Sequence, residues 1–282
     1  MTILIDFSQV AICGIQKAMA STKINVLTED LCRHIILNSL RQHINKFKRE
    51  YGKVVICCDS RSYWRKEYFP YYKITRKKKR EKSDLDWPLI FKVMQEIKDI
   101  SKTDFPYKLL EINRCEADDI IGTLAPRLSA HEPVIIISSD WDYKQLFKYP
   151  NIKQYSPQIE AYVKCDDPHL WLKEKIITGD RKDSVPSILS QDNVFAEEIR
   201  QKPITKKIKD YYFSIDFADV SIDNYKNIQR NKTLLDFECI PTDIKRLIIH
   251  EYEQPQSGNK SQMMKYFIKN KLILLLECLD EF

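Results

Sequence analysis

The stretch Val134-Ile135-Ile136-Ile137-Ser138-Ser139-Asp140-Trp141-Asp142 decides the fold of this chain of 282 residues. Its first four residues are apolar and β-branched without polar alternation, which is typical of a parallel strand buried on both faces. The run then ends in two serines and two aspartates. In open parallel sheets, ligands bind outside the carboxyl ends of the strands. The stretch therefore predicts a buried central strand that presents carboxylates at a binding edge.

Three further segments repeat this pattern, at residues 2–5 before Asp6, 53–58 before Asp59, and 107–112. The segments between the strands carry apolar residues at helical spacing, over residues 28–50, 89–100 and 116–128. Strands that alternate with helices predict an α/β fold with a mostly parallel central sheet flanked by helices.

The pattern changes after about residue 178, where helical segments such as 243–252 and 261–279 are separated by polar turns. We therefore expect an α/β domain over residues 1–178 and a smaller helical region over residues 179–282.

The positive charge of the chain is concentrated in one segment. Residues 73–82 contain seven basic side chains against Glu81 alone, a net +6 that equals the formal net charge of the whole chain. A polyanion should therefore be met mainly at this segment. The basic side chains are Lys73, Arg76, Lys77, Lys78, Lys79, Arg80 and Lys82.

Several classes of protein are disfavoured by what the sequence lacks. The eight cysteines and five histidines show no zinc-ligand spacing, and the five glycines form no phosphate-binding loop. No run of about 18 apolar residues is present. We expect a cytoplasmic protein in a reducing compartment, without zinc, disulfides or membrane contact.

Nine carboxylates come from five separated segments that the predicted fold should bring to one edge of the sheet. They are Asp6, Asp59, Glu116, Asp118, Asp119, Asp140, Asp142, Asp180 and Asp183. Taken singly, each could be a helix cap or a turn residue. Their joint placement is what points to a site.

Such a cluster is unstable without cations. Two carboxylates about 5 Å apart repel by roughly 3 kcal/mol at an effective dielectric constant of about 20. Oxygen ligands without histidine or cysteine suit Mg²⁺ or Mn²⁺. Two such ions can bind the attacking water and the leaving oxygen of a phosphodiester, which is the usual reason for so many acids.

Four ordered acidic motifs resemble those of the flap endonuclease/5′-3′ exonuclease family. They are Leu4-Ile5-Asp6-Phe7-Ser8, Glu116-Ala117-Asp118-Asp119-Ile120-Ile121, Ser138-Ser139-Asp140-Trp141-Asp142 and Gly179-Asp180-Arg181-Lys182-Asp183-Ser184-Val185-Pro186. The segments Tyr63-Trp64-Arg65 and Tyr71-Tyr72-Lys73 strengthen the resemblance, which runs from about residue 2 to the end of the chain.

The resemblance implies two Mg²⁺ sites, at which Mn²⁺ substitutes. The acids of the first site would be Asp6, Asp59, Glu116 and Asp118, and those of the second Asp140, Asp142 and Asp180. Asp119 and Asp183 would take supporting roles. Lys73, Arg65 and Tyr72 match residues that act on the scissile phosphate, where lysine supplies a point charge and arginine a planar fork.

The family hydrolyses nucleotides from 5′ ends or near flap junctions, and its bacteriophage members remove RNA primers during lagging-strand replication. The resemblance therefore implies a monomeric, magnesium-dependent nuclease in the host bacterial cytoplasm. Its partners would be DNA and RNA–DNA duplexes with 5′ ends, nicks or flaps, and a single-stranded-DNA-binding protein. Residues 1–178 would be the nuclease domain, with a helical arch at about 61–88, and residues 179–282 the DNA-binding region.

The segment from residue 61 to residue 82 interleaves aromatic and basic side chains. Bases stack on aromatic rings while cations hold phosphates, so this composition suits a single-stranded path. The alternative is that the aromatics pack onto the core and the basic run, residues 76–80, is a solvated loop. Arg181 and Lys182 would lie beside the duplex, or would be solvated charges.

Rival folds and functions fit the sequence less well. A phosphatase of the haloacid dehalogenase type needs Asp-x-Asp after its first strand, where this chain has Asp6-Phe7-Ser8. A topoisomerase–primase domain needs a glutamate there. A PIN-type ribonuclease would not need the arch or the helical C-terminal third. A DNA-binding protein that has lost catalysis remains open, because sequence does not show that the site assembles.

Overall fold

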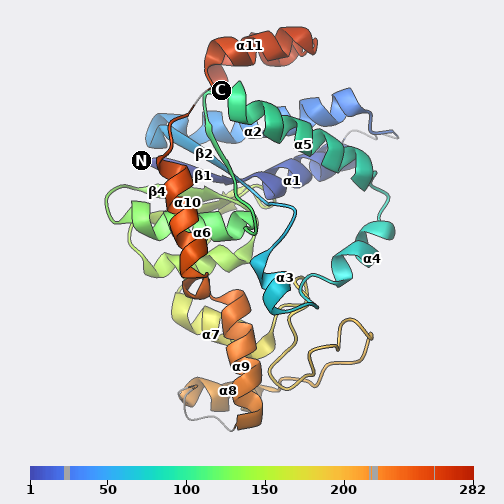
Figure 1. Cartoon of the computed structure of the whole chain (residues 1–282), viewed down its shortest axis with the longest axis vertical. Helices are drawn as coiled ribbons and strands as arrows, with labels where there is room; N and C mark the ends of the chain where they lie inside the picture. The colour runs from blue at the N-terminus through green and yellow to red at the C-terminus, as the bar shows by residue number, and fades with distance from the viewer. Residues whose placement is uncertain (22–25, 216, 218–221, 257) are drawn as a thin grey trace.

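In the computed structural model, residues 1–21, 26–215, 217, 222–256 and 258–282 are described, and they form a three-layered α/β structure (Figure 1). The described strands build one sheet in the order β3-β2-β1-β4-β5-β6. Every pairing is parallel except that of β5 with β6. The strands are β1 (Thr2–Asp6), β2 (Lys53–Cys58), β3 (Lys108–Glu111), β4 (Val134–Ile137), β5 (Ile152–Ser156) and β6 (Ala161–Tyr162). The predicted α/β class with a mostly parallel sheet is confirmed.

The two strands at one side of the sheet, β5 and β6, were not predicted. The β5 sequence Ile-Lys-Gln-Tyr-Ser lacks the apolar run of a central strand. Its buried Gln154 instead donates hydrogen bonds to the carbonyl oxygens of Ser138 (2.8 Å) and Asp140 (2.6 Å). The amide thus holds the end of β4 in place, a contact that a propensity pattern does not reveal.

Side chains of alternating strand positions face two different helical layers. Ile3 and Ile5 of β1 pack with α1 (Phe7–Ser21), α2 (Glu29–Tyr51) and α5 (Trp87–Thr103). Leu4 packs instead with α6 (Ala117–Ser129) and α10 (Thr242–Glu253). Both faces of the strand are buried, which is why its sequence shows no polar alternation.

The helices predicted over residues 28–50, 89–100, 116–128 and 243–252 form with small shifts at their ends, and α1 is a helix that was not predicted. Thr28 caps α2 by accepting a hydrogen bond from the Leu31 amide, and α2 ends before Gly52, whose φ of 80° suits glycine. The remaining elements are α3 (Trp64–Tyr68), α4 (Thr75–Glu81), η1 (Trp141–Lys148), α7 (Pro168–Thr178), α8 (Lys206–Ser214), α9 (Ile222–Leu235), η3 (Phe237–Cys239), α11 (Lys260–Lys269), α12 (Ile273–Glu277) and η4 (Leu279–Glu281).

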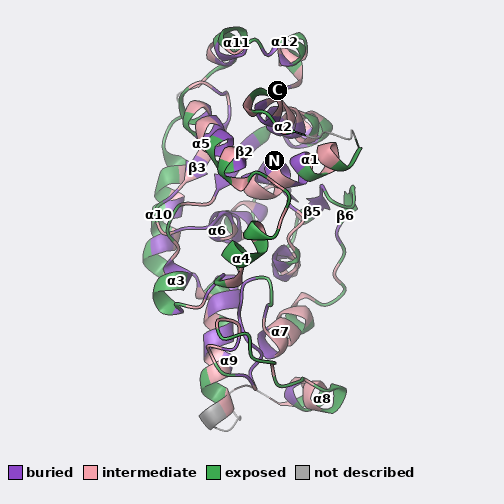
Figure 2. Cartoon of the chain, turned by 90° about the vertical axis from the view of Figure 1, so that its right-hand side faces the viewer, coloured by how far each residue is buried: buried purple, intermediate pink, exposed green. Residues whose placement is uncertain are grey.

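The C-terminal part of the chain packs at both ends of the molecule, and between them α10 packs against α6. Helices α7, α8 and α9 form the lower end of the molecule in Figures 1 and 2, around a small cluster that includes Ile177 and Ile228. The last residues return to the opposite end, where Phe267 and Phe282 join the core that α2 and α5 cover. Residues 179–282 thus contribute to all four hydrophobic clusters of the described residues, and a domain boundary near residue 178 stays a prediction.

The predicted helical segment over residues 261–279 is divided into α11, α12 and η4. The chain turns between α11 and α12, where Lys271 adopts a φ of 54°. This turn lets Leu272 and Leu275 bury their side chains together with Phe267.

None of the helices in the described ranges is long and apolar enough to cross a membrane.

Burial of the C-terminal aromatic ring predicts a measurable loss of stability. Phe282 is 4% exposed and its ring centroid lies 5.3 Å from that of Phe267. We expect Phe282→Ala to lower the free energy of unfolding by about 3 kcal/mol, since it leaves a cavity in the core. Urea denaturation followed by circular dichroism measures the change.

The matched control is Ile268→Ala, because Ile268 lies on α11 in the same part of the chain but is 55% exposed. We expect it to cost less than about 1 kcal/mol. Equal losses for the two variants would contradict the packing described for the C-terminus.

Candidate functional site

The carboxyl ends of the parallel strands bring four of the acidic segments to one edge of the sheet. Asp6 ends β1, Asp59 follows β2, and Asp140 follows β4. From β1 the chain runs to β2 and β3 on one side, and β4 then pairs with the other side of β1. The strand order therefore reverses between β1 and β4, the place where open α/β sheets bind ligands.

Backbone and hydroxyl groups orient the acids at the ends of β1 and β2. The Ser138 hydroxyl donates to Asp6 Oδ2 at 2.9 Å. The Asp59 carboxylate accepts from the Ser8 hydroxyl at 2.7 Å and from the Ala117 amide at 2.9 Å. Since Ala117 begins α6, the second bond joins the edge of the sheet to the third acidic segment.

The first turn of α6 supplies three acids with different surroundings. Glu116 caps the helix, and its own amide donates to Asp119 Oδ2 at 2.9 Å. Asp119 is fully buried and also accepts from Arg65 at 2.7 Å and from the Trp64 indole at 3.1 Å. Asp119 is therefore held by hydrogen bonds within the protein, which fits a supporting role. Asp118 lies between Glu116 and Asp119 in sequence and is half-buried.

The other acids form a second group on η1 and after α7. The Asp142 amide donates to Asp140 Oδ1 at 3.0 Å. Asp180 Oδ1 accepts from the amides of Lys182 (2.6 Å) and Asp183 (3.3 Å). The turn before Asp180 requires Gly179, because its φ is 71° and an added Cβ would lie 2.3 Å from the Val185 carbonyl oxygen.

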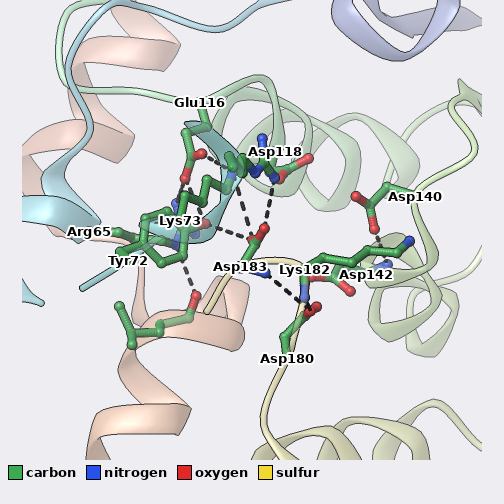
Figure 3. Close-up of polar contacts among 12 residues, drawn as sticks. Arg65, Tyr72, Lys73, Glu116, Asp118, Asp140, Asp142, Asp180, Lys182 and Asp183 are labelled. Atoms are coloured by element: carbon green, nitrogen blue, oxygen red, sulfur yellow. Dashed lines mark hydrogen bonds and ion pairs between the residues drawn. The ribbon is translucent and has the colours of Figure 1, made fainter. Parts of the chain in front are cut away.

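Cations and hydroxyls from the segment after β2 reach into these acids (Figure 3). The Lys73 ammonium donates to Glu116 Oε1 and lies 3.7 Å from Asp183. The Tyr72 hydroxyl lies 3.0 Å from Glu116 and 2.9 Å from Asp183. Lys73 adopts a φ of 56°, and its amide donates to the Asp183 carbonyl oxygen at 2.7 Å. The predicted residues Lys73 and Tyr72 are thus brought to the acids.

Arg65 lies among the acids but is turned away from solvent. It is 2% exposed, and its guanidinium donates to Glu116 (3.1 Å), to Asp119 (2.7 Å) and to the Leu234 carbonyl oxygen (2.9 Å). The planar guanidinium of Arg65 is therefore already bound to two carboxylates of the protein itself. The expectation that this fork faces a substrate phosphate does not match the burial of the side chain.

Two residues at the site carried no motif and were not predicted. The Lys175 ammonium of α7 pairs with Asp142 and, at 2.6 Å, with Asp180. The Tyr143 hydroxyl lies 2.6 Å from Asp118 and 3.3 Å from Asp6. The position of Tyr143 directly after Asp142 was the only signal that could have found it.

Burial and mutual repulsion act strongly on the ionisation of these acids. The pKa of Asp6 is raised to about 7, first by burial and then by Asp59. The pKa of Asp142 is also raised to about 7, by burial and then by Asp140. Burial, followed by Asp140, raises the pKa of Asp118 well above its usual range. The negative charge of the cluster is therefore only partly compensated by the protein, which favours a bound cation.

Asp183 behaves in the opposite way. Burial alone would raise its pKa, but Lys73 and Arg76 together hold the pKa of this carboxyl below its usual range. Arg76 donates to Asp183 at 2.7 Å. Asp183 is therefore ionised and paired within the protein.

The donor set suits a hard divalent cation, because it consists of carboxylate oxygens with neither histidine nor cysteine among them. The described residues include no three such ligands already arranged around one point. Lysine ammonium groups instead neutralise Glu116, Asp142 and Asp180. A divalent cation that binds here would neutralise part of the negative charge that the lysines now neutralise.

The basic run forms the exposed helix α4, which lies in front of α6 in Figure 2. Lys77 is 85% exposed, while Lys78 pairs with Glu198 at 2.7 Å and Arg80 lies over the Phe91 ring. The run is thus a helix rather than a solvated loop. Arg181 and Lys182 are exposed in the turn between Asp180 and Asp183.

The expectation that the aromatic residues after Asp59 form a stacking path is wrong for Trp64, Phe69 and Tyr72. Each is less than 5% exposed. Phe69 packs on Leu234 and Leu235, so the rings fasten the segment to the protein. Of the other aromatic residues in this segment, Tyr68 is 50% exposed, whereas Tyr63 and Tyr71 are partly buried.

Two family models match the chain. The model of the 5′-3′ exonuclease N-terminal resolvase-like domain matches residues 15–181, and the model of the T4 RNase H C-terminal region matches residues 167–282. Ribonuclease H of enterobacteria phage T4 is 32% identical to this chain over 99% of the chain and 95% of that protein. The motifs quoted above also resemble the ribonuclease H of T-even bacteriophages, and this resemblance is confirmed.

Solved structures with the same fold come from bacteriophage T5. The T5 D15 flap endonuclease in a pseudo-enzyme–product complex with DNA and metal ions has a TM-score of 0.61 and 16% identity, covering 90% of this chain and 99% of that one. The T5 D15 protein co-crystallised with metal ions has a TM-score of 0.59 and 15% identity, covering 89% and 98%.

The buried position of Arg65 predicts a large effect on stability. Arg65→Met leaves Glu116 and Asp119 as buried acids without this partner. We expect the free energy of unfolding to fall by about 3 kcal/mol or more, since breaking a buried ion pair leaves an uncompensated charge. Urea denaturation in EDTA measures the loss.

The control is Arg114→Met, which removes an arginine that pairs with Glu67 at 2.6 Å where both side chains are about half exposed. An exposed pair contributes less than about 1 kcal/mol. If Arg65→Met were no more destabilising than Arg114→Met, the buried ion pairs of Arg65 with Glu116 and Asp119 would not stabilise the fold.

Proposed function

The chain belongs to the 5′-3′ exonuclease family and is a nuclease, and from this premise we propose that it hydrolyses phosphodiester bonds at 5′ ends, nicks and flaps of DNA and RNA–DNA duplexes. The family that the four acidic motifs resemble is thereby confirmed. A relative that is a phage ribonuclease H supports a role in removing RNA primers during phage lagging-strand replication. A single-stranded-DNA-binding protein is the proposed protein partner.

The observation that carries the proposal is the convergence of nine acids from five segments at the reversal point of the sheet. Acids that lie far apart, as separate helix caps or turn residues, would have little effect on one another's pKa. Here burial is the first cause of the raised pKa of Asp6 and Asp142, and repulsion adds to it, from Asp59 and Asp140 for Asp6 and from Asp140 and Asp180 for Asp142. A site that concentrates negative charge in this way is suited to binding cations for phosphoryl chemistry.

We propose two divalent metal sites, with Mg²⁺ as the ion and Mn²⁺ as a substitute. The first would be held by Asp6, Asp59, Glu116 and Asp118, and the second by Asp140, Asp142 and Asp180, with Asp119 and Asp183 in support. Metal ions bound there would supply an activated water and stabilisation of the leaving oxygen. Relatives of the same fold were crystallised with metal ions, which supports the proposal.

The basic and phenolic side chains of the protein would take the remaining roles at the site. Lys73 lies at the acids on a strained backbone turn, so its ammonium is suited to neutralise charge that develops on the phosphate. Arg65 and Tyr72 are buried, and we propose that they act by holding Glu116, Asp119 and Asp183 in position. Helix α4, together with Arg181 and Lys182, would bind the backbone of the nucleic acid.

The test gives the purified chain a 5′-labelled flap substrate and a nicked RNA-primed duplex, each with Mg²⁺ and with EDTA. We expect Mg²⁺-dependent release of short 5′ products, whose lengths separate exonucleolytic from junction cutting. Asp140→Asn should lower turnover at least ~100-fold, about 2.7 kcal/mol in the barrier, while circular dichroism stays unchanged.

The control is Asp243→Asn, because Asp243 is 69% exposed and lies on α10, outside the acid cluster. It should cleave as the unmodified chain does. Structure-selective binding without cleavage under any divalent metal would contradict the proposed function, and normal turnover of Asp140→Asn would contradict the metal assignment.

The exposed face of α4 predicts a salt-dependent contribution to DNA binding. Replacing Lys77, Lys78, Lys79 and Arg80 by serine should make the slope of log affinity against log salt less negative, by about 0.9 for each duplex phosphate that the run neutralises. Binding is measured in Ca²⁺ by fluorescence anisotropy between about 50 and 200 mM salt.

The matched control removes the same charge elsewhere, by replacing Lys260, Lys265, Lys269 and Lys271 of the α11 segment, which lies at the far end of the molecule in Figure 1. For this control variant we expect the slope of log affinity against log salt to equal that of the unmodified chain. Equal slopes for the α4 variant and the unmodified chain would mean that the run does not touch DNA.

A further inference from the structure

We propose that Tyr143 is a positioning residue of the nuclease site, whose hydroxyl holds the carboxylate of Asp118 beside that of Asp6 in the arrangement that binds a divalent cation. The inference rests on the proposed function, because it concerns acids to which that function assigns a metal. It adds a residue that no motif of the chain contains.

The geometry places one phenolic oxygen against two acids from different elements. Tyr143 is fully buried, and its oxygen lies 2.6 Å from Asp118 Oδ1 and 3.3 Å from Asp6 Oδ2. A phenol has a single proton to donate, so the shorter contact marks Asp118 as the acceptor. Asp6 Oδ2 receives its donor from the Ser138 hydroxyl instead.

Asp118 depends on this contact more than the neighbouring acids depend on theirs. Asp59 accepts from a hydroxyl and from a backbone amide, and Asp119 accepts from Arg65, Trp64 and the Glu116 amide. Among the described residues, the hydrogen bond found for the Asp118 carboxylate is the one from Tyr143. Without it, that carboxylate would have only its attraction to Lys73 to oppose the repulsion from Asp140 and Asp6.

The ring of Tyr143 is anchored by the C-terminal part of the chain. Its centroid lies 5.9 Å from that of Phe237. Two residues further on, Gln145 donates to the carbonyl oxygens of Asp142 (2.9 Å) and Leu235 (3.0 Å) and accepts from the Phe237 amide (2.9 Å). Phe237 therefore packs on the ring of Tyr143, and the hydrogen bonds of Gln145 fix the backbone of η1. The Tyr143 hydroxyl is thus a rigid donor rather than a mobile one.

The position of Tyr143 also couples the two groups of acids. Asp140 and Asp142 belong to the second group, and the next residue along η1 donates to the first group. A shift of η1 would therefore move ligands of both proposed sites together. Groups that orient metal ligands in this way commonly change metal affinity 10–100-fold when they are removed.

The test is Tyr143→Phe, which removes the hydroxyl and keeps the ring. We expect the affinity of the substrate-free protein for Mn²⁺, measured by calorimetry and by electron paramagnetic resonance of the free ion, to fall about 10-fold or more. The Mg²⁺ concentration for half-maximal cleavage should rise by a similar factor, while kcat at saturating Mg²⁺ changes less.

The matched control is Tyr155→Phe, because Tyr155 is 4% exposed and its hydroxyl also has a hydrogen-bond partner, Lys46, at 2.7 Å, away from the acids. We expect normal Mn²⁺ affinity for this variant and similar unfolding midpoints for both variants in EDTA. A purely structural role of Tyr143 would lower its midpoint and leave metal affinity unchanged, which would overturn the inference.

A second variant keeps the inference testable if Tyr143→Phe does not fold. Phe237→Leu keeps the hydroxyl but loosens the support of the ring, and it should also weaken Mn²⁺ binding. Unchanged Mn²⁺ affinity in this variant would then overturn the inference. Absence of metal binding by the unmodified chain would instead contradict the proposed function.

Discussion

The repulsion among buried carboxylates at the carboxyl edge of the sheet is the constraint on which the rest of the structure depends. Hydrophobic burial on both faces of β1 and β4 fixes where the strands end, and each strand end carries an acid. The acids are then too close to be ionised together at little cost, as the raised pKa values of Asp6, Asp118 and Asp142 indicate. Basic side chains around the acids neutralise part of this charge, and hydrogen-bond donors hold the carboxylates in place.

Compensation comes from segments that are distant in sequence. Arg65 and Lys73 reach Glu116 from the segment after β2, and Lys175 bridges Asp142 and Asp180 from α7. Both cations at Glu116 are buried, with Arg65 2% and Lys73 8% exposed, and Lys73 lies two residues before the exposed helix α4. Their burial against Glu116 helps to hold this acid rigidly, as a catalytic site requires.

Sequence reasoning succeeded where a local pattern had a local cause. The apolar runs of β1, β2 and β4 and the helical spacing over residues 28–50 and 116–128 follow from burial against the two faces of the sheet. It failed for β5, whose Gln154 is buried because it bonds the end of β4. It also failed for Trp64, Phe69 and Tyr72, because composition alone does not distinguish a ring that stacks on a base from one that packs on Leu234.

The sequence by itself determined the α/β class and the family, and it singled out the acids that we propose as metal ligands, because strand ends and helix starts are set by residues adjacent along the chain. Only the tertiary structure decided which cations meet which acids and that Arg65 faces inward. It also decided that the Tyr143 hydroxyl donates to Asp118 and lies 3.3 Å from Asp6. Those contacts join residues up to 137 positions apart, and their distances depend on how helices and loops pack above the sheet rather than on any local pattern.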